Sequence, residues 1–240
     1  MARSTRVPGE KPLFWVGSAK ADLLDFPEAA KDEIGVALSV AQLGGKHSKA
    51  KPWKGEGSGV LEIVEDHRRD TYRAVYTVKF SQAVYVLHAF QKKSPRGIKT
   101  AQADVELVSR RLKSASEDYE RDMANGKNSD AVIPSSGNVF ADLGLRDAEE
   151  KQTRVRLAVA INQIIQARLL SQTAAARLLD VNQPKISALM NYRLEGFSVE
   201  RLMHFLNALD RDVEIVIRKK PRSRRSARIM VTESQLSHAG

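Results

Sequence analysis

The stretch Ser171-Gln-Thr-Ala-Ala-Ala-Arg-Leu-Leu-Asp-Val-Asn-Gln-Pro-Lys-Ile-Ser-Ala-Leu-Met190 predicts two short helices joined by a tight turn. Ser171 and Asn182 are suitable N-caps, because their side chains can accept a hydrogen bond from a backbone amide in the first turn of a helix. Ala175 is small enough for the two helices to pack closely. The apolar residues expected to form the shared core of the pair are Leu178, Val181, Ile186 and Leu189. This spacing predicts a helix-turn-helix.

The second of these helices is expected to present polar and small side chains on its outer face. In a helix-turn-helix, the N-terminal residues of this helix reach base edges in the major groove, and a Gln can pair bidentately with adenine. Gln172 and Arg193 would hold phosphates, which fixes the register on DNA. The predicted DNA-binding residues are Gln172, Gln183, Pro184, Lys185, Ser187, Asn191 and Arg193. The alternative is a plain four-helix bundle, in which these residues only face water.

Two further helices and a strand are predicted around this pair. Apolar residues at helical spacing predict a helix over 154–169, and Ser198 is a suitable N-cap for a helix that reaches Leu209. The segment from Val213 to Ile217 predicts a single strand. Because a lone strand leaves both of its edges unpaired, we expect it to pair with its copy in a homodimer.

The chain before residue 123 has a different pattern, with strands as well as helices. It predicts a strand at 13–16, a helix over 20–42 broken near Phe26-Pro27, strands at 60–64, 72–80 and 83–90, and a helix over 101–120. The short connections between the last three strands suit an antiparallel meander. We therefore predict an α+β fold: a small antiparallel sheet with helices, followed by an all-α helix-turn-helix domain with a C-terminal dimerisation strand.

The two parts are separated by a stretch rich in turn-forming residues from Asn125 to Gly137. The predicted organisation is a first domain over 1–122, a linker over 123–137, a second domain over 138–218 and a basic tail over 219–240. The tail carries about half of the formal net charge of +10. Such a charge run favours a polyanionic partner, because each neutralised phosphate releases counterions, although it also fits a solvated terminus.

Composition narrows the classes of function. The chain has no cysteine, so disulfides and thiolate metal sites are excluded. It has neither a run of about 18 apolar residues nor the apolar segment of a secretory signal, so we expect a soluble cytoplasmic protein with no membrane partner. No Asp/Glu/His cluster has metal-ligand spacing, and there is no glycine-rich phosphate loop. We expect neither a metal nor a cofactor.

The C-terminal half resembles the Xre/Cro-like antitoxins of HigA type. The resemblance covers most of residues 135–218 and rests on Ser136-Ser-Gly-Asn-Val-Phe-Ala-Asp-Leu-Gly-Leu145, Gln183-Pro-Lys-Ile-Ser187 and Gly196-Phe-Ser-Val-Glu-Arg-Leu-Met203. One departure is Asp180, where the family usually has Gly in the turn. Asp tolerates a left-handed backbone better than most residues. The resemblance implies binding to operator DNA and repression of the protein's own gene.

The N-terminal part resembles the RelE/HigB-type mRNA interferase toxins. This resemblance covers about residues 12–120 and rests on Trp53-Lys-Gly-Glu-Gly-Ser-Gly-Val-Leu-Glu62, Tyr72-Arg-Ala-Val-Tyr76 and Tyr85-Val-Leu-His-Ala-Phe-Gln-Lys-Lys-Ser94. It implies a RelE-like fold and an endoribonuclease that cuts mRNA on the ribosome. Because the family usually encodes toxin and antitoxin as separate chains in this order, the sequence resembles a fused toxin–antitoxin pair.

The chemistry of metal-free RNA cleavage selects candidates in this domain. It requires a deprotonated 2′-hydroxyl, a stabilised phosphorane and a protonated leaving oxygen. A guanidinium suits a phosphate, His titrates near neutral pH, and Lys can stabilise the phosphorane. The predicted catalytic residues are Arg73, His88, Lys92 and Lys93, and the predicted RNA-binding residues are Arg68, Arg69 and Lys54. Strict alternation along 85–93 places His88 and Lys92 on the face opposite Tyr85 and Leu87.

Each of these candidates also has a structural interpretation. Arg73 can pair with Glu62 across neighbouring strands instead of binding RNA. A single His on a strand is often structural, and lysines at a strand end can be a solvated edge.

We therefore expect a toxin–antitoxin protein in one chain, whose N-terminal endonuclease is held inactive by the attached antitoxin domain. An apolar cluster, Phe140, Leu143 and Leu145, is expected to dock on the toxin domain and neutralise it. One alternative is a DNA-binding repressor whose toxin-like domain is catalytically inactive. Another is an RNA-binding adaptor that grips RNA without cutting it.

Overall fold

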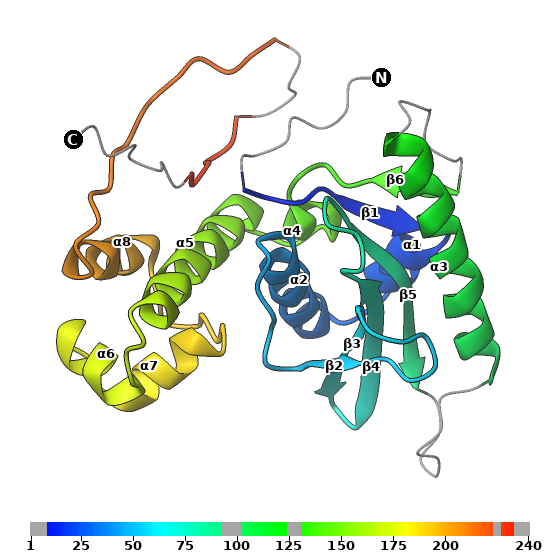
Figure 1. Cartoon of the computed structure of the whole chain (residues 1–240), viewed down its shortest axis with the longest axis horizontal. Helices are drawn as coiled ribbons and strands as arrows, with labels where there is room; N and C mark the ends of the chain where they lie inside the picture. Colours follow the sequence, from blue (N-terminus) through cyan, green and yellow to red (C-terminus); the bar gives the residue numbers. More distant parts are fainter. Residues whose placement is uncertain (1–8, 93–101, 124–130, 223–226, 233–240) are drawn as a thin grey trace. The chain divides into compact units, whose positions relative to one another are not determined.

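The computed structural model describes residues 9–92, 102–123, 131–222 and 227–232, which fold into two compact units (Figure 1). The boundary between the units follows Ala148. The N-terminal unit contains strands and helices, and the C-terminal unit is helical. None of the described helices is long and apolar enough to cross a bilayer.

The N-terminal unit is built on a six-stranded sheet with the order β2-β3-β4-β5-β1-β6. The strands are β1 (Leu13–Val16), β2 (Ala50–Pro52), β3 (Val60–His67), β4 (Asp70–Thr77), β5 (Val84–Lys92) and β6 (Val132–Pro134). Strands β2 to β5 form the predicted antiparallel meander, extended by the short β2, which the sequence did not predict. The sheet is nevertheless mixed and not wholly antiparallel, because β1 runs parallel to β5.

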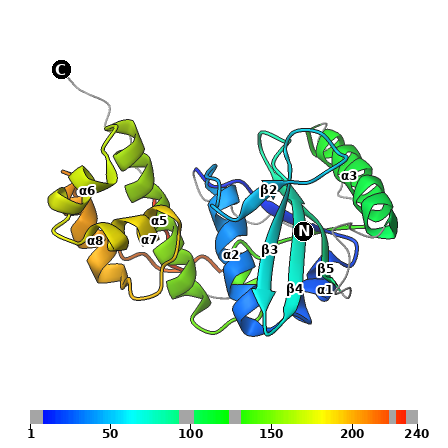
Figure 2. The same cartoon turned by 90° about the horizontal axis from the view of Figure 1, so that it is seen from below.

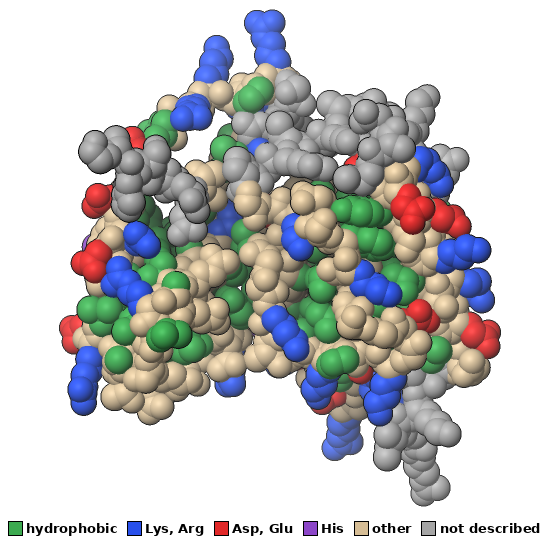
Figure 3. All heavy atoms as spheres, viewed as in Figure 1, with side chains coloured by type: hydrophobic (Ala, Val, Ile, Leu, Met, Phe, Trp, Pro, Cys, Tyr) green, Lys and Arg blue, Asp and Glu red, His purple; other side chains and the backbone are tan. Residues whose placement is uncertain are grey.

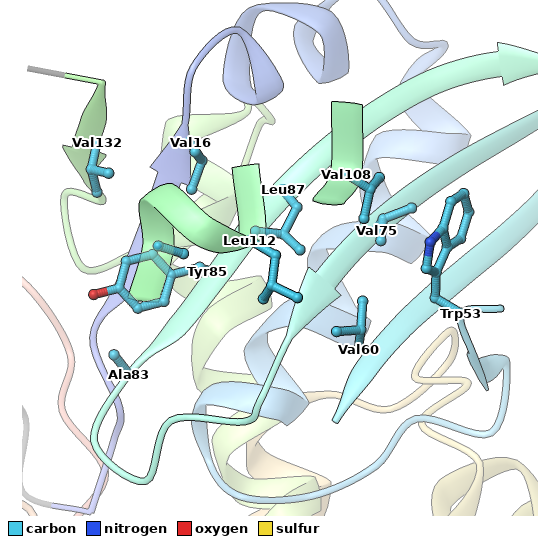
Figure 4. Packing of buried hydrophobic residues seen from close by; sticks show 11 residues of the cluster. Val16, Trp53, Val60, Val75, Ala83, Tyr85, Leu87, Val108, Leu112 and Val132 are labelled. Atoms are coloured by element: carbon cyan, nitrogen blue, oxygen red, sulfur yellow. The ribbon is translucent and has the colours of Figure 1, made fainter. Parts of the chain in front are cut away.

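Helices cover both faces of this sheet. They are α1 (Ala19–Leu24), α2 (Glu28–Gln42), α3 (Gln102–Met123) and α4 (Val139–Asp142). Pro27 separates α1 from α2, as predicted, because its extended backbone at ψ 148° interrupts the helix. Figure 2 shows α2 and α3 on opposite sides of β3 and β4. Under α3, the side chains of Val75, Leu87, Val108 and Leu112 pack into one apolar cluster (Figure 4).

A β-bulge in β5 corrects the predicted alternation of side chains. Tyr76 pairs with Val86, but Val75 pairs with His88, so Leu87 is an extra residue in the ladder. Leu87 packs in the cluster under α3, and the His88 ring contacts residues of the same helix. The two neighbours therefore face the same side of the sheet. The prediction that they lie on opposite faces is wrong, because a bulge breaks the period of two.

The C-terminal unit consists of α5 (Ala148–Ala167), α6 (Gln172–Leu178), α7 (Gln183–Met190) and α8 (Val199–Ala208). The predicted caps are confirmed: Ser171, Asn182 and Ser198 each accept a hydrogen bond from an amide in the first turn of the following helix. Asp180 has φ +50°, so it adopts the left-handed backbone of the turn. Of the predicted core residues, Ile186 and Leu189 are buried and Val181 is partly buried. The prediction is wrong at Leu178, which is 42% exposed, while its neighbour Leu179 is buried at 4% exposed.

Two other predictions differ from the structure. The predicted linker, residues 123–137, contains strand β6, because residues 132–134 pair antiparallel with β1 at the edge of the sheet. The strand expected from Val213 to Ile217 is absent, and these residues run extended and exposed. A strand requires a partner, and no described segment of the chain pairs with this one. Of the predicted basic tail, residues 219–222 and 227–232 are described.

Candidate nucleic-acid interfaces

The first residues of α6 and α7 bring two predicted DNA-binding side chains together. Gln172 begins α6 and Gln183 begins α7, and Gln183 Nε2 donates a hydrogen bond to Gln172 Oε1 over 3.2 Å. This contact orients the Gln183 amide at the exposed N-terminus of α7. Pro184 and Arg193 are exposed as well. The arrangement can offer amide groups to base edges and a guanidinium to the phosphate backbone.

Other predicted DNA-binding residues are engaged within the unit. Lys185 Nζ donates to the carbonyl oxygen of Gly196 over 2.9 Å and lies 4.3 Å from the centroid of the Phe197 ring. Asn191 Nδ2 donates to the carbonyl oxygen of Ser187 over 2.7 Å. These side chains stabilise α7 and the turn after it. Lys185 must leave Gly196 before it can reach DNA.

A buried polar residue that sequence reasoning missed positions α7. Asn162, in the middle of α5, is almost completely buried and its Nδ2 donates to the carbonyl oxygen of Leu189 over 3.0 Å. The same carbonyl also accepts from the Tyr192 amide over 3.0 Å, so the bond from Asn162 adds a second contact that ties α5 to the C-terminal end of α7. A polar residue among the apolar positions of α5 is the signal that could have found it.

In the N-terminal unit, Arg73 has a protein partner. Its Nη1 lies 2.8 Å from Glu62 Oε2, and both side chains are largely buried. The ion pair that the sequence allowed as an alternative is therefore formed. Arg73 lies opposite Phe90 on β5, and Lys92 is two residues farther along that strand, so the backbone places both cations on one face of the sheet.

His88 sits in a polar cluster between β5, α1 and α3. Its Nε2 is 3.2 Å from Asp104 Oδ1, and its Nδ1 is 3.3 Å from Arg111 Nη1. Asp22 Oδ2 lies farther away, at 3.9 Å from Nδ1. Burial lowers the pKa of His88, and the positive charge of Arg111 acts in the same direction, whereas Asp104 opposes it. A neutral ring protonated at Nε2 satisfies both close contacts, because Nε2–H donates to Asp104 and Nδ1 accepts from Arg111.

Arg111 is a residue that the sequence reasoning missed. Strand β1 ends at Val16, so the backbone of β5 beyond Val86 has no neighbouring strand on that side. Arg111 fills this gap: Nη1 donates to the carbonyl oxygen of Leu87 over 2.9 Å, and Nη2 donates to Ser18 Oγ over 2.6 Å. Burial lowers the pKa of Arg111. The cluster holds the end of β5 against α1 and α3.

The predicted RNA-binding residues are exposed but do not form one group. Arg68 and Arg69 form the tip of the β3–β4 hairpin with φ of +49° and +75°, and Lys54 lies in the loop between β2 and β3. Lys93 lies outside the described residues. In the space-filling view, Lys and Arg side chains are spread over the face shown and do not gather in a single patch (Figure 3). Among the described residues, no group of His, Asp and Glu could hold a metal ion.

The three apolar residues expected to neutralise the toxin domain are buried in the N-terminal unit. Phe140 and Leu143 are fully buried, and Leu145 is nearly so. They belong to α4 and the turn after it, and α4 packs on α2. Gly35 of α2 makes room for this contact: a Cβ there would lie 3.0 Å from Phe140 Cδ1 and 3.6 Å from Leu143 Cδ1.

Polar contacts join the same segment to the start of the chain. The buried carboxylate of Asp142 accepts a hydrogen bond from Trp15 Nε1 over 3.1 Å and pairs with Lys20 Nζ at 3.4 Å. Strand β6 adds to the edge of β1, with Val16 opposite Val132. Residues 131–148, which we call the anchor segment, thus contribute a strand, a helical turn and a buried carboxylate to the N-terminal unit.

Comparison with known proteins assigns a class to each part. Residues 139–218 match the family described as "Helix-turn-helix domain", and residues 21–113 match the family described as "Phage derived protein Gp49-like". A solved structure titled "Putative XRE Family Transcriptional Regulator" is 68% identical to this chain over the aligned residues, with a TM-score of 0.36. The alignment covers 37% of this chain and 99% of the solved chain. Comparison with curated proteins found no match.

The chain therefore has a Gp49-like, toxin-related domain in its N-terminal part and a helix-turn-helix domain of XRE type in its C-terminal part. Through the second domain it belongs to the XRE family. This domain supports DNA binding, and the order of the two domains is consistent with a toxin–antitoxin fusion.

Proposed function

We propose that this chain is a toxin and its antitoxin in one polypeptide. The C-terminal unit binds operator DNA and represses the protein's own gene. The N-terminal unit is a ribosome-associated, metal-independent mRNA endonuclease, of HigB type, which the attached HigA-type antitoxin holds inactive.

One observation carries the proposal. The helix-turn-helix match begins at residue 139, yet residues 139–148 pack in the N-terminal unit. Sequence that matches the helix-turn-helix family therefore contributes to the Gp49-like unit, through Phe140 on α2 and Asp142 on Trp15. A docked antitoxin segment is what inhibition by a bound partner requires.

The anchor segment holds the two parts together without covering the cationic residues of the sheet. Its strand β6 lies at the edge of the sheet beside β1, and α4 lies on α2. Arg73 is on β4, separated from β6 by β5 and β1, and shares the α3-facing side of the sheet with Phe90. In this proposal neutralisation comes from the bulk of the tethered DNA-binding unit, which keeps the endonuclease from entering the ribosome. A tether raises the local concentration of the inhibitor to about millimolar, so inhibition persists without high affinity.

For RNA cleavage, the candidate catalytic residues must exchange partners. Arg73 would give up Glu62 for a phosphate, which suits a guanidinium because it can bind two phosphate oxygens. His88 would leave Arg111 so that Nδ1 accepts the 2′-hydroxyl proton, and the same imidazole would then pass that proton to the leaving 5′-oxygen. Lys92 and Lys93 would stabilise the phosphorane.

The same contacts favour a second candidate function. Arg73 and both ring nitrogens of His88 have partners within the unit, as expected if these residues only stabilise the fold. The chain would then be a transcriptional repressor whose toxin-like domain is catalytically inactive.

A cleavable chain separates the two functions. A specific protease site is inserted within residues 124–130, between α3 and β6, and Phe140→Ala is introduced to weaken the anchor. This substitution lies on the C-terminal fragment, so the N-terminal fragment keeps its own sequence. Leu178→Ala, at an exposed position of the same fragment, is the matched control. Both proteins are cut and added to translating ribosomes, and the reporter mRNA is mapped for new 5′ ends.

The proposal predicts mRNA cleavage by the cut Phe140→Ala protein and little by the uncut protein or by the cut control. A released N-terminal fragment that remains folded by circular dichroism and cuts no mRNA would establish the repressor with an inactive toxin-like domain. Operator binding is tested separately by footprinting the promoter of the gene with the uncut chain.

A further inference from the structure

The ion pair between Arg73 and Glu62 is only partly satisfied. Arg73 Nη1 lies 2.8 Å from Glu62 Oε2, and the two side chains are 16% and 15% exposed. Arg73 Nε is buried and has no acceptor among the described residues. A phosphate offers several oxygens and can bind a guanidinium through two hydrogen bonds at once. Arg73 can therefore gain hydrogen bonds when a phosphate takes the place of Glu62.

The release of Arg73 leaves Glu62 in need of another cation. Removing one partner of a buried ion pair is strongly destabilising, because the remaining charge stays away from water without compensation. An exchange of partners at Arg73 therefore requires a second cation within reach of the Glu62 carboxylate.

Lys51 on β2 is in that position. In the ladder between β2 and β3 it lies directly opposite Glu62, and the Cβ atoms of such a pair are about 4.5–5.5 Å apart on one face of the sheet. Arg73 shares this face, because Glu62 is also opposite Val75, which is two residues from Arg73 on β4. Lys51 is exposed, and within the part of the chain that the structure describes it makes no ion pair.

We propose that Lys51 is the second cation of Glu62: when an RNA phosphate takes Arg73, the Glu62 carboxylate pairs with Lys51 instead. Lys51 is then a positioning residue, which acts through Glu62 and does not touch the RNA. The exchange lets a largely buried ion pair open without leaving an uncompensated carboxylate. This inference rests on the proposed binding of RNA at Arg73.

A double-mutant cycle on the stability of the full chain tests the exchange without RNA. Arg73→Met imitates the departure of Arg73, and urea denaturation is followed by the fluorescence of the two tryptophans, both in the N-terminal unit. Lys51→Met should leave the urea midpoint of the wild-type chain unchanged. In the Arg73→Met background it should lower the midpoint by about 0.5 M, because only there does Glu62 depend on Lys51.

Two further variants control this cycle. Lys51→Arg keeps the positive charge, so it should change the midpoint in neither background. Lys113→Met removes an exposed lysine of α3 and should also change neither. Equal shifts by Lys51→Met in the two backgrounds, or no shift in the Arg73→Met background, would overturn the proposal.

A titration with RNA tests the exchange in the presence of a phosphate. The probe is a short 2′-O-methyl oligoribonucleotide, which lacks the free 2′-hydroxyl that cleavage requires. In NMR spectra of the full chain, the Nε–H signal of Arg73 is assigned by its loss in Arg73→Met and reports binding at this residue alone. Lys51→Met should weaken this binding about fivefold in the wild-type chain and leave it unchanged in the Glu62→Gln background.

Two results of the titration would contradict the exchange. A loss of binding that persists in the Glu62→Gln background would mean that Lys51 contacts a phosphate directly. An Arg73 signal that the RNA does not move would mean that Arg73 stays with Glu62. Neither experiment measures mRNA cleavage, so failure of the exchange is distinguished from failure of the proposed nuclease, which the cut chain reports.

Discussion

In the N-terminal unit, two of the side chains proposed to act on RNA, Arg73 and His88, are held by partners from the same unit. In the C-terminal unit, Gln183 and Pro184 stand exposed at the start of α7. Arg73 is bound to Glu62, and His88 is bound between Asp104 and Arg111. In the proposed function, DNA would therefore meet exposed groups at the start of α7, although Lys185 would first have to leave Gly196, whereas RNA would have to displace the partners of Arg73 and His88. The difference fits the proposed function, in which the DNA-binding unit is in use while the proposed nuclease is held inactive.

The largest expected effect on the difference between the two units is at Phe140. This residue lies within the helix-turn-helix match but packs in the N-terminal unit. Phe140→Ala should lower the unfolding free energy of the N-terminal unit by about 3–5 kcal/mol, the usual cost of truncating a buried Phe. Both tryptophans of the chain, Trp15 and Trp53, are in this unit, so Trp fluorescence during urea denaturation reports on it alone. An unchanged Trp transition would contradict the account.

The variant Gly35→Ala tests the contact between α2 and Phe140 from the other side. Because the added Cβ would lie 3.0 Å from the Phe140 ring, it should cost about 1–3 kcal/mol in an otherwise native chain. In the Phe140→Ala background the cost should nearly vanish, since the ring that it meets is gone. Strictly additive effects would mean that the two residues are not in contact.

Acid should destabilise the N-terminal unit selectively. Burial lowers the pKa of His47 from 6.5 to about 4, with the charge of Lys49 as a second cause. Because the folded unit binds this proton less readily than the unfolded chain, the stability is fully present above pH 6.5 and is lost as the pH falls toward 4. At about 1.4 kcal/mol per pKa unit, the loss is roughly 3 kcal/mol.

The change is followed by urea denaturation monitored by Trp fluorescence between pH 7.5 and 4. The variant His47→Gln should flatten the dependence on pH, and carboxylates that titrate in the same range are common to both proteins. Equal slopes for the variant and the wild type would rule out His47 as the source.

The Arg73–Glu62 pair offers a smaller and more specific test. Arg73→Met should cost about 1–3 kcal/mol because it leaves a largely buried carboxylate without its cation. Adding Glu62→Met should restore most of that loss. The double variant would then be folded but unable to bind a phosphate at this position, so the cut and released unit should lose mRNA cleavage. Full cleavage activity in this variant would remove Arg73 from the proposed mechanism.

The smallest effect on stability is expected at Gln183. Gln183→Ala should change the unfolding free energy by less than about 0.5 kcal/mol, since the side chain is exposed. It should weaken operator binding about tenfold, because a bidentate contact to a base contributes about 1–3 kcal/mol of discrimination. Gel-shift titrations at fixed salt measure this. Equal losses on unrelated DNA would indicate a phosphate contact instead.

Local signals in the sequence predicted much of the fold. The caps Ser171, Asn182 and Ser198 act on neighbouring amides, and the β3–β4–β5 meander depends on short connections, so both can be inferred from adjacent residues. What could not be inferred depends on contacts distant in sequence. The pairing of β6 with β1 joins residues more than 110 positions apart.

The candidate site shows the same limit. Counting alternate residues along β5 placed His88 on the wrong face, because the bulge at Leu87 arises from the fit between β4 and β5 and leaves no mark in the sequence of one strand. Sequence reasoning missed Arg111 because its role depends on two distant features. Strand β1 ends early, and α3, which comes much later in the chain, brings Arg111 to the backbone of β5 that β1 leaves uncovered. The Arg73–Glu62 pair could be anticipated because it joins adjacent strands of a hairpin.

The central claim is that the anchor segment belongs to the toxin-like unit, and native-state hydrogen exchange on the full chain tests it directly. The Ser135 amide donates to the carbonyl oxygen of Leu13 over 2.9 Å, and the Leu143 amide donates to that of Val139 over 3.0 Å. These two amides should open with the same free energy as the slowest amides of β5, and Phe140→Ala should lower all of them together. Exchange of Ser135 and Leu143 with the free energy of α5–α8, or with no protection, would contradict the account.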